Sequence, residues 1–531
     1  MSSRLMNAGR MLKQVELRYG KLTALVNVER NRAFSYWELH EITNKVCNML
    51  RDTFGLREGD RYATLVENDN MALVLIWMLK SLCTVVWLGI RDSLEEHLYQ
   101  IDYTKPRLIF IEKQLLPEYY EFLSERNMII ISMDKPDVPM RGLYYFWELI
   151  DQSSPSDPDA EYGYDDVNKH ICLLKFTGGT TGKGKCAMFS LENFLGAATN
   201  SSWSTEVFLS ENPKLLVSTP LTHAASSYVL PCYFRGGTIV TINRVDIEQM
   251  CQTVEKERID LLQSIPTVLY RMVDMGLTKK YDLSSLKIIR YGASPISPSK
   301  LEVLIKEFGR IFVQGYAATE SWTPCTILGR NDHDVTTEAG RKRLHSLGRV
   351  VPGMEVKISD DNGRELAIGE VGEIWIRGPI TIQGYHNDPE QTKENFSGDG
   401  FFKSGDMGYM DNEGFIYLVD RKKDMIISGG FNVYAVEVEN CLNSHAAVKE
   451  SAVVGIPDDY WGEAVHAEVV LKEAERIGQE ELINYCKQHI ARYKAPKTIK
   501  FVTELPLSPI GKVLRRAIKE KYWENQKRRI H

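Results

Sequence analysis

Short apolar runs alternate with helical patterns over the first two thirds of the chain. Two of these runs, 108–111 and 128–131, consist of four consecutive apolar residues and are separated by a segment with helical spacing. Runs of this length are typical of strands buried on both faces, and their alternation with helices is typical of a parallel sheet. The pattern therefore predicts an α/β fold in which helices cover parallel or mixed sheets.

The longest apolar stretch, residues 71–90, is interrupted by Lys80 and Ser81 and then becomes rich in β-branched residues. A membrane-spanning helix needs about 20 predominantly apolar residues without such a break. We therefore expect a buried helix followed by a buried strand, and no integral membrane segment.

The hydrophobic pattern changes twice in the last third of the chain. Glycine turns at 361–363 and 412–414 separate alternating apolar segments, which predicts a mainly antiparallel β part. After the charged run 420–424, strand and helix patterns alternate again up to the C-terminus. Because 531 residues exceed one ordinary core, we expect a large domain over 1–420 and a small α+β domain over 421–531.

Composition narrows the classes of function. Hydrophobic residues make up 43% and charged residues 26%, as in an ordinary soluble globular protein. The net charge of −6 gives no support to a nucleic-acid partner. Nine scattered cysteines without a C-x-x-C pair indicate neither a zinc site nor a disulfide framework, and they favour a reducing, cytoplasmic location. Residues 1–20 lack the apolar core of a secretory signal, although a weak amphipathic targeting peptide stays open.

A glycine-rich loop, residues 176–185, follows the apolar run 171–174. Its four glycines let backbone N–H groups approach a ligand, and its threonines and lysines add hydroxyl donors and positive charge, which suits a polyphosphate. A Walker A loop would need Gly at position 177 and Ser or Thr at position 184, where this chain has Thr177 and Gly184. The loop thus predicts a different kind of nucleotide-phosphate site; a plain surface turn is the alternative.

Candidate site residues follow three further predicted strands, which cover residues 215–219, 286–291 and 311–313. His223 comes after the first, Gly292, Ala293 and Ser294 after the second, and the run 314–320 after the third. Open parallel sheets bind ligands at the carboxyl ends of their strands, so these residues predict a site at one sheet edge. A lone histidine is as often a packed or exposed bystander, and that interpretation of His223 stays open.

The segment from Thr177 to Cys186 resembles the T-S-G-T-T-G-x-P-K-G loop of the acyl-adenylate-forming superfamily. This superfamily includes acyl- and aryl-CoA ligases, luciferases and peptide-synthetase adenylation domains. The chain departs from the loop pattern at Gly178 for Ser, Gly184 for Pro and Cys186 for Gly. Further motifs occur in family order up to Lys512, a combination far more specific than one loop. The pattern is closest to that of the acid-CoA ligases.

The resemblance implies an ATP site with a magnesium ligand. The glycine loop would hold the β- and γ-phosphates through Thr177, Gly178, Gly179, Thr180, Thr181, Gly182 and Lys185. The run Tyr316, Ala317, Ala318, Thr319, Glu320 matches the family's Y-G-x-T-E, with Ala317 in place of Gly, and Gly315 directly before it is also assigned to the nucleotide site. In that motif Tyr packs on adenine, Thr contacts the α-phosphate and Glu holds Mg²⁺, a suitable role for a carboxylate.

The resemblance also assigns residues to ribose recognition and to two domain orientations. Asp406 matches the Asp that receives the ribose hydroxyls, and Arg421 matches an Arg that contacts ribose and phosphate. The family places its catalytic lysine at the position of Lys512 and its hinge at that of Lys423. Rotation of a mobile small domain would then replace Lys512 by the loop containing Gly429 and Gly430, past which a pantetheine arm could run close to the backbone.

The sequence further limits the acid. In the resembling family a His or aromatic at the position of His223 gates the acyl pocket, and amino-acid-activating members carry an Asp just after it. Residues 224–227 contain no acid, so a free amino acid would leave its ammonium unpaired. The added methyl of Ala317 and the small residues around His223, Gly292, Ala293 and Ser294 favour a compact acyl pocket.

These features predict an ATP- and Mg²⁺-dependent acid-CoA ligase. It would use CoA and favour a short or medium, branched, hydroxylated or aromatic acid over a long chain. One alternative is an adenylating enzyme that loads an acyl carrier protein or uses another acceptor. Another is a nucleotide-binding regulatory protein without turnover, against which Lys512, Glu320 and Asp406 argue. The oligomeric state is not fixed by the sequence, and a homodimer stays open.

Overall fold

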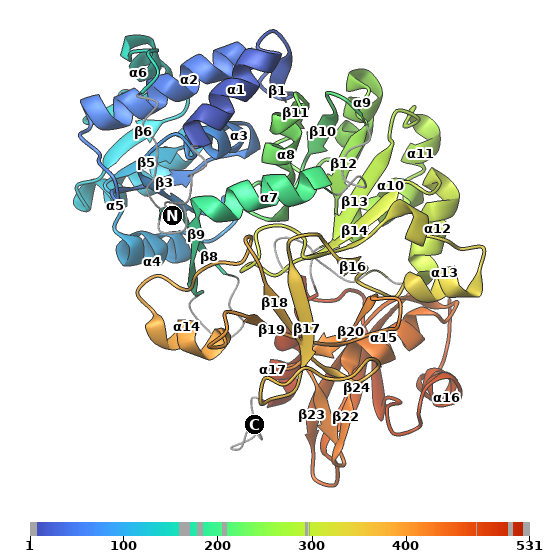
Figure 1. The fold of residues 1–531 in the computed structure, drawn as a ribbon. Helices are drawn as coiled ribbons and strands as arrows, with labels where there is room; N and C mark the ends of the chain where they lie inside the picture. Colours follow the sequence, from blue (N-terminus) through green and yellow to red (C-terminus); the bar gives the residue numbers. More distant parts are fainter. Residues whose placement is uncertain are drawn as a thin grey trace.

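The computed structural model describes residues 8–158, 170–177, 184–203, 210–292, 296, 298–473, 475–507 and 513–523. Two large sheets stand beside each other, and an antiparallel sheet and a C-terminal unit lie below them in the view of Figure 1. No helix within the described ranges is both long and apolar enough to span a bilayer.

The first large sheet has seven strands in the order β7-β6-β5-β3-β4-β8-β9, and only β8 and β9 run antiparallel. These are β3 (Arg61–Leu65), β4 (Thr84–Trp87), β5 (Leu108–Ile111), β6 (Ile129–Ser132), β7 (Leu143–Tyr145), β8 (Ile171–Phe176) and β9 (Cys186–Ser190). The run 108–111 is β5 as predicted, and 128–131 becomes β6 one residue later. The stretch 71–90 is confirmed as the buried helix α3 (Asn68–Trp77) followed by the buried strand β4.

The second large sheet has nine strands in the order β16-β15-β14-β13-β12-β10-β11-β1-β2. These are β1 (Thr23–Asn27), β2 (Arg32–Ser35), β10 (Lys214–Val217), β11 (Thr238–Thr241), β12 (Leu261–Ser264), β13 (Ile288–Gly292), β14 (Phe312–Tyr316), β15 (Thr326–Leu328) and β16 (Arg349–Val350). Strands β10, β12, β13 and β14 are parallel neighbours. Their carboxyl ends therefore share one sheet edge, as the positions of the motifs predicted.

Helices cover both large sheets, which confirms the α/β class. On the nine-stranded sheet, one face carries an apolar cluster with α9, α10 and α12, and the other face contributes to the main core, which also contains residues of the seven-stranded sheet (Figure 1). The helices of the large part are α1 (Ala8–Tyr19), α2 (Tyr36–Asn48), α4 (Leu94–Thr104), α5 (Leu116–Glu125), α6 (Phe146–Gln152), α7 (Leu191–Trp203), α8 (Val229–Phe234), α9 (Ile247–Glu257), α10 (Pro266–Asp274), α11 (Leu277–Lys280), α12 (Pro298–Phe308), α13 (Glu338–Arg343) and α14 (Pro389–Asn395).

The predicted antiparallel part is a four-stranded sheet in the order β17-β18-β19-β20. Its strands are β17 (Glu355–Ser359), β18 (Gly372–Arg377), β19 (Phe402–Met410) and β20 (Ile416–Arg421). The turn at 412–414 joins β19 directly to β20, as expected. After the turn at 361–363, the chain forms only a single bridge, between Ser359 and Glu365. A second turn then precedes β18, and in it the Gly369 N–H donates to the carbonyl of Met410.

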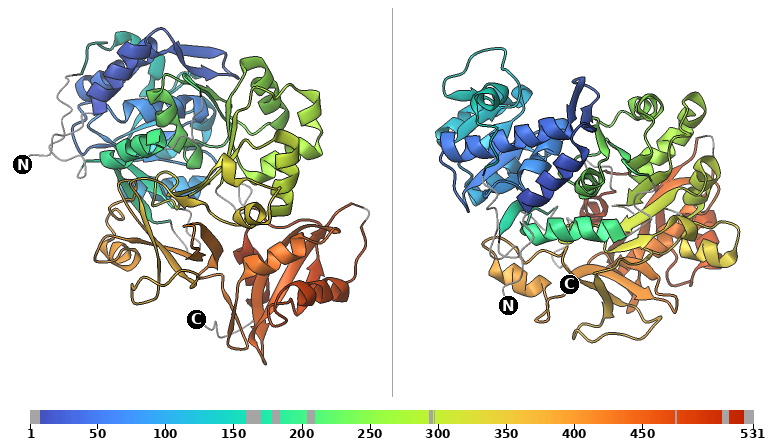
Figure 2. Two further views of the ribbon diagram at one scale, coloured as in Figure 1. Left: turned by 45° about the vertical axis from the view of Figure 1, so that its right-hand side comes forward. Right: turned by 45° about the horizontal axis from the view of Figure 1, so that its top comes forward.

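The C-terminal unit packs around a core of its own. Its sheet contains β21 (Ile426–Ser428), β22 (Phe431–Val433), β23 (Val448–Asp458), β24 (Gly462–Leu471) and β25 (Thr498–Phe501), with helices α15 (Ala435–Asn443), α16 (Gln479–His489) and α17 (Arg515–Trp523). All core members of this sheet's main cluster come from residues 426–499. Figure 2 shows this α+β unit in orange to red as a distinct body, in keeping with the expected small domain. The boundary after residue 420 stays a prediction.

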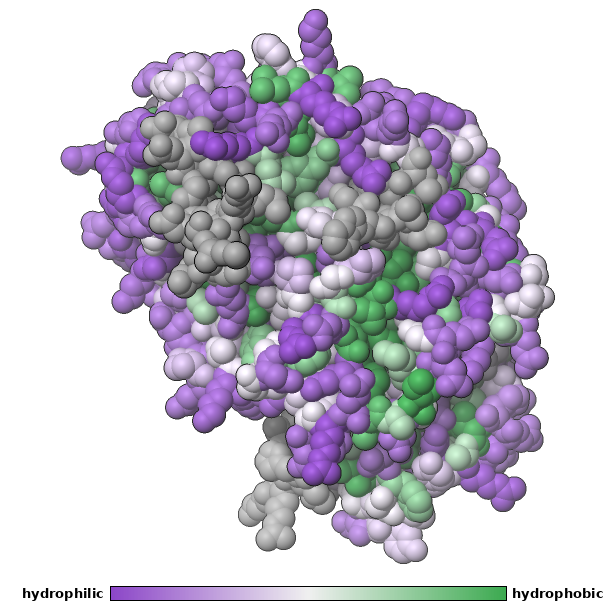
Figure 3. Space-filling model, viewed as in Figure 1, coloured by the Kyte–Doolittle hydropathy of each residue, from purple (hydrophilic) through white to green (hydrophobic). Residues whose placement is uncertain are grey.

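One arginine joins the two parts. Arg515 of α17 lies 2.5 Å from the Glu439 carboxylate in the small unit and 3.4 Å from that of Asp420 at the end of β20. Burial raises the pKa of Asp420 to about 6, although the positive charge of Arg515 opposes this shift. Figure 3 shows that the face of the molecule seen in Figure 1 is mainly polar, with apolar side chains gathered near its centre.

Candidate active site

The carboxyl ends of β13 and β14 approach too closely for side chains. Gly292 and Gly315 are register partners, and a Cβ on Gly292 would lie 2.4 Å from the carbonyl oxygen of Gly315. A Cβ on Gly315 would lie 2.6 Å from the ring of Pro324. Both positions therefore require glycine, because neighbouring protein atoms occupy the space that a side chain would need.

Three residues far apart in sequence converge beside these glycines. The Tyr316 hydroxyl donates to Asp406 Oδ2 over 2.6 Å, and Arg421 Nε lies 3.0 Å from Oδ1 of the same carboxylate. Asp406 and Arg421 face each other across β19 and β20, and Asp406 is only 5% exposed. Burial, reinforced by the charge of Asp406, raises the pKa of Tyr316 well above its usual value, so its hydroxyl remains a donor. The structure thus brings together the aromatic and the carboxylate predicted for adenine and ribose.

We expect Asp406→Asn to weaken nucleotide binding by about 10- to 100-fold, since a hydrogen bond to a charged group contributes about 1.5–3 kcal/mol. Calorimetric titration with AMP measures the effect. Tyr316→Phe is the matched control, because it removes only the hydroxyl that donates to Asp406 and keeps the aromatic ring. Unchanged AMP affinity in a folded Asp406→Asn protein would contradict a ribose role.

Glu320, the predicted metal ligand, lies in a cluster with two residues that the sequence analysis did not single out. The Tyr385 hydroxyl donates to Glu320 Oε1 over 2.7 Å. Lys175, near the end of β8, is desolvated by the surrounding protein, which lowers its pKa to about 8 against the opposing effect of the Glu320 charge. The position of Lys175 at the end of the apolar run of β8 could have identified it as a functional residue from the sequence. The residues around Tyr385 contain no comparable signal.

The glycine loop begins and ends in the same region. Thr177 N–H donates to the carbonyl of Lys185 over 2.8 Å, and a Cβ on Gly184 would lie 2.3 Å from the Thr177 carbonyl oxygen. This conformation therefore leaves no room for the proline that the family pattern has at position 184. Lys185 Nζ lies 5.1 Å from the Tyr385 ring centroid and donates to Asn395 Oδ1, so its charge is close to the Glu320–Tyr385 pair.

Several predicted residues lie outside the described ranges: Gly178, Gly179, Thr180, Thr181, Gly182, Ala293, Ser294 and Lys512. Among the described ones, Thr319 is half-buried beside Glu320, and Ala317 is exposed, as a residue lining an open ligand site would be. His223 precedes the short 3-10 helix η3 (Ala224–Tyr228), and its Nδ1 lies 3.1 Å from Thr222 Oγ1.

The predicted hinge and thioester-loop residues lie toward the C-terminal unit. Lys423 is in the turn after β20, where burial lowers its pKa and the charge of Arg421 adds to that effect. Gly429 and Gly430 have φ angles of 60° and 81°, a region that favours glycine. A Cβ on Gly429 would lie 2.5 Å from the Trp461 ring, so this loop packs against its own unit.

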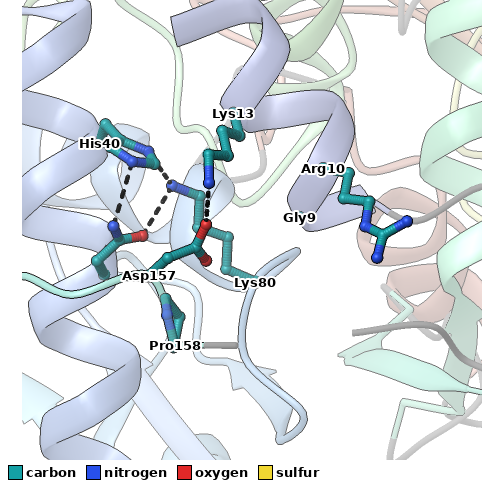
Figure 4. A pocket seen from close by; sticks show the side chains of 8 residues that line it. Gly9, Arg10, Lys13, His40, Lys80, Asp157 and Pro158 are labelled. Carbon is teal, nitrogen blue, oxygen red and sulfur yellow. Dashed lines mark hydrogen bonds and ion pairs between the residues drawn. The ribbon is translucent and has the colours of Figure 1, made fainter. Parts of the chain in front are cut away.

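A separate pocket between α1 and α2 is lined by charged residues but is not a candidate active site (Figure 4). Lys80 and Glu16 are each 2% exposed, and Lys80 Nζ lies 3.1 Å from Glu16 Oε1. His40 also contacts Glu16, and Lys13 pairs with Asp157 over 2.7 Å. These charged groups pair with one another, and none of the residues that line the pocket belongs to the predicted nucleotide-binding motifs.

Comparisons with known proteins bear on this geometry. Residues 12–386 match the AMP-binding enzyme family, and residues 437–512 match the AMP-binding enzyme C-terminal domain. A medium/long-chain-fatty-acid–CoA ligase, FadD8, of Mycobacterium tuberculosis is 37% identical over 395 residues, which cover 72% of this chain and 67% of that protein. A 3-[(3aS,4S,7aS)-7a-methyl-1,5-dioxo-octahydro-1H-inden-4-yl]propanoyl:CoA ligase of Rhodococcus jostii is 30% identical over 96% of this chain and 97% of that protein. A feruloyl-CoA synthase of an Amycolatopsis species is 35% identical over 70% and 73%.

Solved structures share the architecture. The o-succinylbenzoate CoA synthetase of Bacillus subtilis, in complex with its acyl-adenylate intermediate, is 26% identical, with a TM-score of 0.80 over 96% of this chain and 97% of that one. ATP-bound MatB of Rhodopseudomonas palustris has a TM-score of 0.85 over 97% and 99% at 24% identity, which supports the fold alone.

Proposed function

The chain belongs to the AMP-binding enzyme family, and from this premise we propose that it is an AMP-forming acid-CoA ligase dependent on ATP and Mg²⁺. The carboxylate of an acid attacks the α-phosphate of ATP and releases pyrophosphate, after which the CoA thiol displaces AMP from the acyl-adenylate. The convergence of Tyr316 and Arg421 on the buried carboxylate of Asp406 carries the proposal.

The described residues fit the electrostatic needs of the first step. Acid and phosphate are both negative, so their approach requires fixed cations and donors. Lys175 and Lys185 supply positive charge near the Glu320–Tyr385 pair. Glu320 keeps a second carboxylate oxygen beside the one that Tyr385 contacts and would hold Mg²⁺, which offsets phosphate charge when bound.

Product release with and without CoA tests the proposal. We expect pyrophosphate release that depends on an added acid, and AMP release that CoA accelerates. Acid-dependent pyrophosphate release without any effect of CoA would instead favour a carrier protein or another acceptor. Absence of acid-dependent pyrophosphate release across a broad panel of acids would contradict a ligase.

The acyl pocket of this enzyme is proposed to favour a short or medium, branched, hydroxylated or aromatic acid. The relatives are named for fatty acids, a feruloyl group and a bicyclic propanoyl group, so the family fixes no single size. Support comes from Ala317, which adds a methyl where the resembling motif has glycine, and from the close approach of Gly292 and Gly315.

We expect Ala317→Gly to raise kcat/KM for long-chain acids relative to short ones. Overpacking by one methyl group typically costs about 1–3 kcal/mol, which corresponds to a change of about 5- to 100-fold. The measurement compares acids of increasing chain length in the wild type and in the variant, with Ala318→Gly as the neighbouring control. A wild type that already prefers sixteen-carbon acids would show that Ala317 forms no such wall.

A further inference from the structure

A buried arginine near the end of β13 has no charge partner among the described residues. Arg290 is 1% exposed, and its Nε, Nη1 and Nη2 atoms have no hydrogen-bond acceptor among the residues that the structure describes. Burial lowers the pKa of its guanidinium, yet an arginine keeps its charge in proteins. Two residues later the same strand reaches Gly292 at the edge of the nucleotide site.

The sheet register directs Arg290 to the face that carries the candidate site. Arg290 is opposite Gln263 of β12 and Val313 of β14, and Gly292 is opposite Gly315 one strand period later. Side chains two residues apart in a strand share a face. Val313 packs in the main core, whereas Phe312 packs in the cluster under α9, α10 and α12. Arg290 is therefore on the main-core side of the sheet, the same side as Gly292 and Gly315.

The aromatic ring of Tyr228 packs against the guanidinium group of this arginine. The Cζ atom of Arg290 lies 3.8 Å from the Tyr228 ring centroid. The Tyr228 hydroxyl in turn lies 3.3 Å from the point where a Cβ on Gly315 would stand. Tyr228 ends η3, the short helix that His223 precedes. Tyr228 thus contacts Arg290, lies close to Gly315 and belongs to the segment predicted to gate the acyl pocket.

Two other shielded arginines among the described residues pair with carboxylates. Arg30 lies within 3.5 Å of Glu67, Asp69, Glu112 and Asp134. Arg515 pairs with Glu439 and Asp420. An unpaired buried charge is strongly destabilising, and stacking on an aromatic ring recovers only part of that cost. The opposite residue, Gln263, offers no negative charge, and its Oε1 also lacks a described partner.

Building on the ligase function proposed above, we propose that Arg290 binds a second carboxylate of the acid substrate, which makes this enzyme a ligase of dicarboxylic acids. One carboxylate is adenylated near Gly292, and the other forms a bidentate pair with the guanidinium, a geometry for which arginine is well suited. Two strand residues correspond to about 7 Å. The spacer between the carboxylates is therefore short, in agreement with the compact pocket proposed for Ala317.

Substrate pairs that differ by one charge test this assignment. Malonate, succinate, glutarate and adipate are compared with their monomethyl esters by acid-dependent pyrophosphate release. We expect at least one diacid to exceed its ester about 100-fold in kcat/KM, mainly through KM, and Arg290→Met to abolish that preference. Lys287→Gln is the matched control, because Lys287 is an exposed cation just before the same strand. A wild type that prefers the esters, or an Arg290→Met variant that keeps the diacid preference, would overturn the inference and leave the ligase function standing.

Thermal denaturation provides a readout that does not require turnover. Arg290→Met should raise the melting temperature of the ligand-free protein, because it removes an uncompensated charge, and it should remove the stabilisation that a diacid gives the wild type. If no acid supports pyrophosphate release, the ligase function fails, and diacid stabilisation that depends on Arg290 still supports the binding site. A lower melting temperature with unchanged diacid stabilisation would identify Arg290 as a structural residue and overturn the inference.

Discussion

Lys512→Ala is expected to slow acid-dependent pyrophosphate release by about 10²- to 10³-fold, the usual loss for one positioned electrostatic group. The same variant should still form a thioester from supplied acyl-adenylate. The reason is that Lys512 resembles the family's catalytic lysine in its position, and we propose that it acts in only one of two domain orientations. Lys512 itself lies outside the described residues, but its flanks are joined, since Leu507 and Val513 form a β-bridge and Leu514 N–H donates to the Pro506 carbonyl.

Separate assays of the two half-reactions measure this effect. Arg516→Ala is the matched control, because Arg516 is a nearby exposed cation that pairs with Glu520 on α17. It should leave both half-reactions close to the wild type. Equal damage to adenylation and thioester formation in Lys512→Ala would show that the lysine is not specific to one orientation.

The second large effect is expected at the turn between the two parts. Lys423→Pro should keep pyrophosphate release and lose CoA-dependent turnover, because proline fixes φ at position 423 and restricts residue 422 before it. In the structure Lys422 N–H donates to the Gly405 carbonyl, which holds the start of this turn against strand β19. A backbone change at the turn is what a domain rotation would need.

Lys423→Ala separates the backbone from the side chain in this experiment. It removes the ammonium group but leaves φ free, so CoA-dependent turnover should survive in it far better than in the proline variant. Single-turnover measurements of acyl-adenylate decay in the presence of CoA give the comparison. Normal overall turnover in Lys423→Pro would eliminate the two-orientation mechanism for this protein.

The central strands of the seven-stranded sheet, such as β4 and β5, were predictable because their residues are buried and largely apolar. The run 108–111 needs no partner information to be recognised as a buried strand, and the structure gives it the same bounds. Turn chemistry was less informative. Residues 361–363 do turn, but strand β18 begins only at Gly372, since pairing depends on a second turn that the local pattern does not reveal.

The candidate site was predictable only where a motif carried it. Tyr316, Asp406 and Arg421 were named from the sequence, but their mutual contact depends on how two sheets meet, which no local pattern encodes. Tyr385 was missed for the same reason, because it reaches Glu320 across 65 residues. Arg290 is visible in the sequence as a charged residue inside an apolar strand. Its possible role became apparent only from the structure, in which no counter-ion among the described residues faces it.

The separately packed C-terminal sheet also affects how this enzyme can change during evolution. Substitutions in the cluster over residues 426–499 alter packing within that unit, while the large sheets keep their own core. The ion pair of Arg515 with Asp420 is a contact through which a change in the unit would also affect the end of β20. We propose acid preference for residues of the large sheets and acceptor chemistry for the small unit, so the two properties could diverge independently.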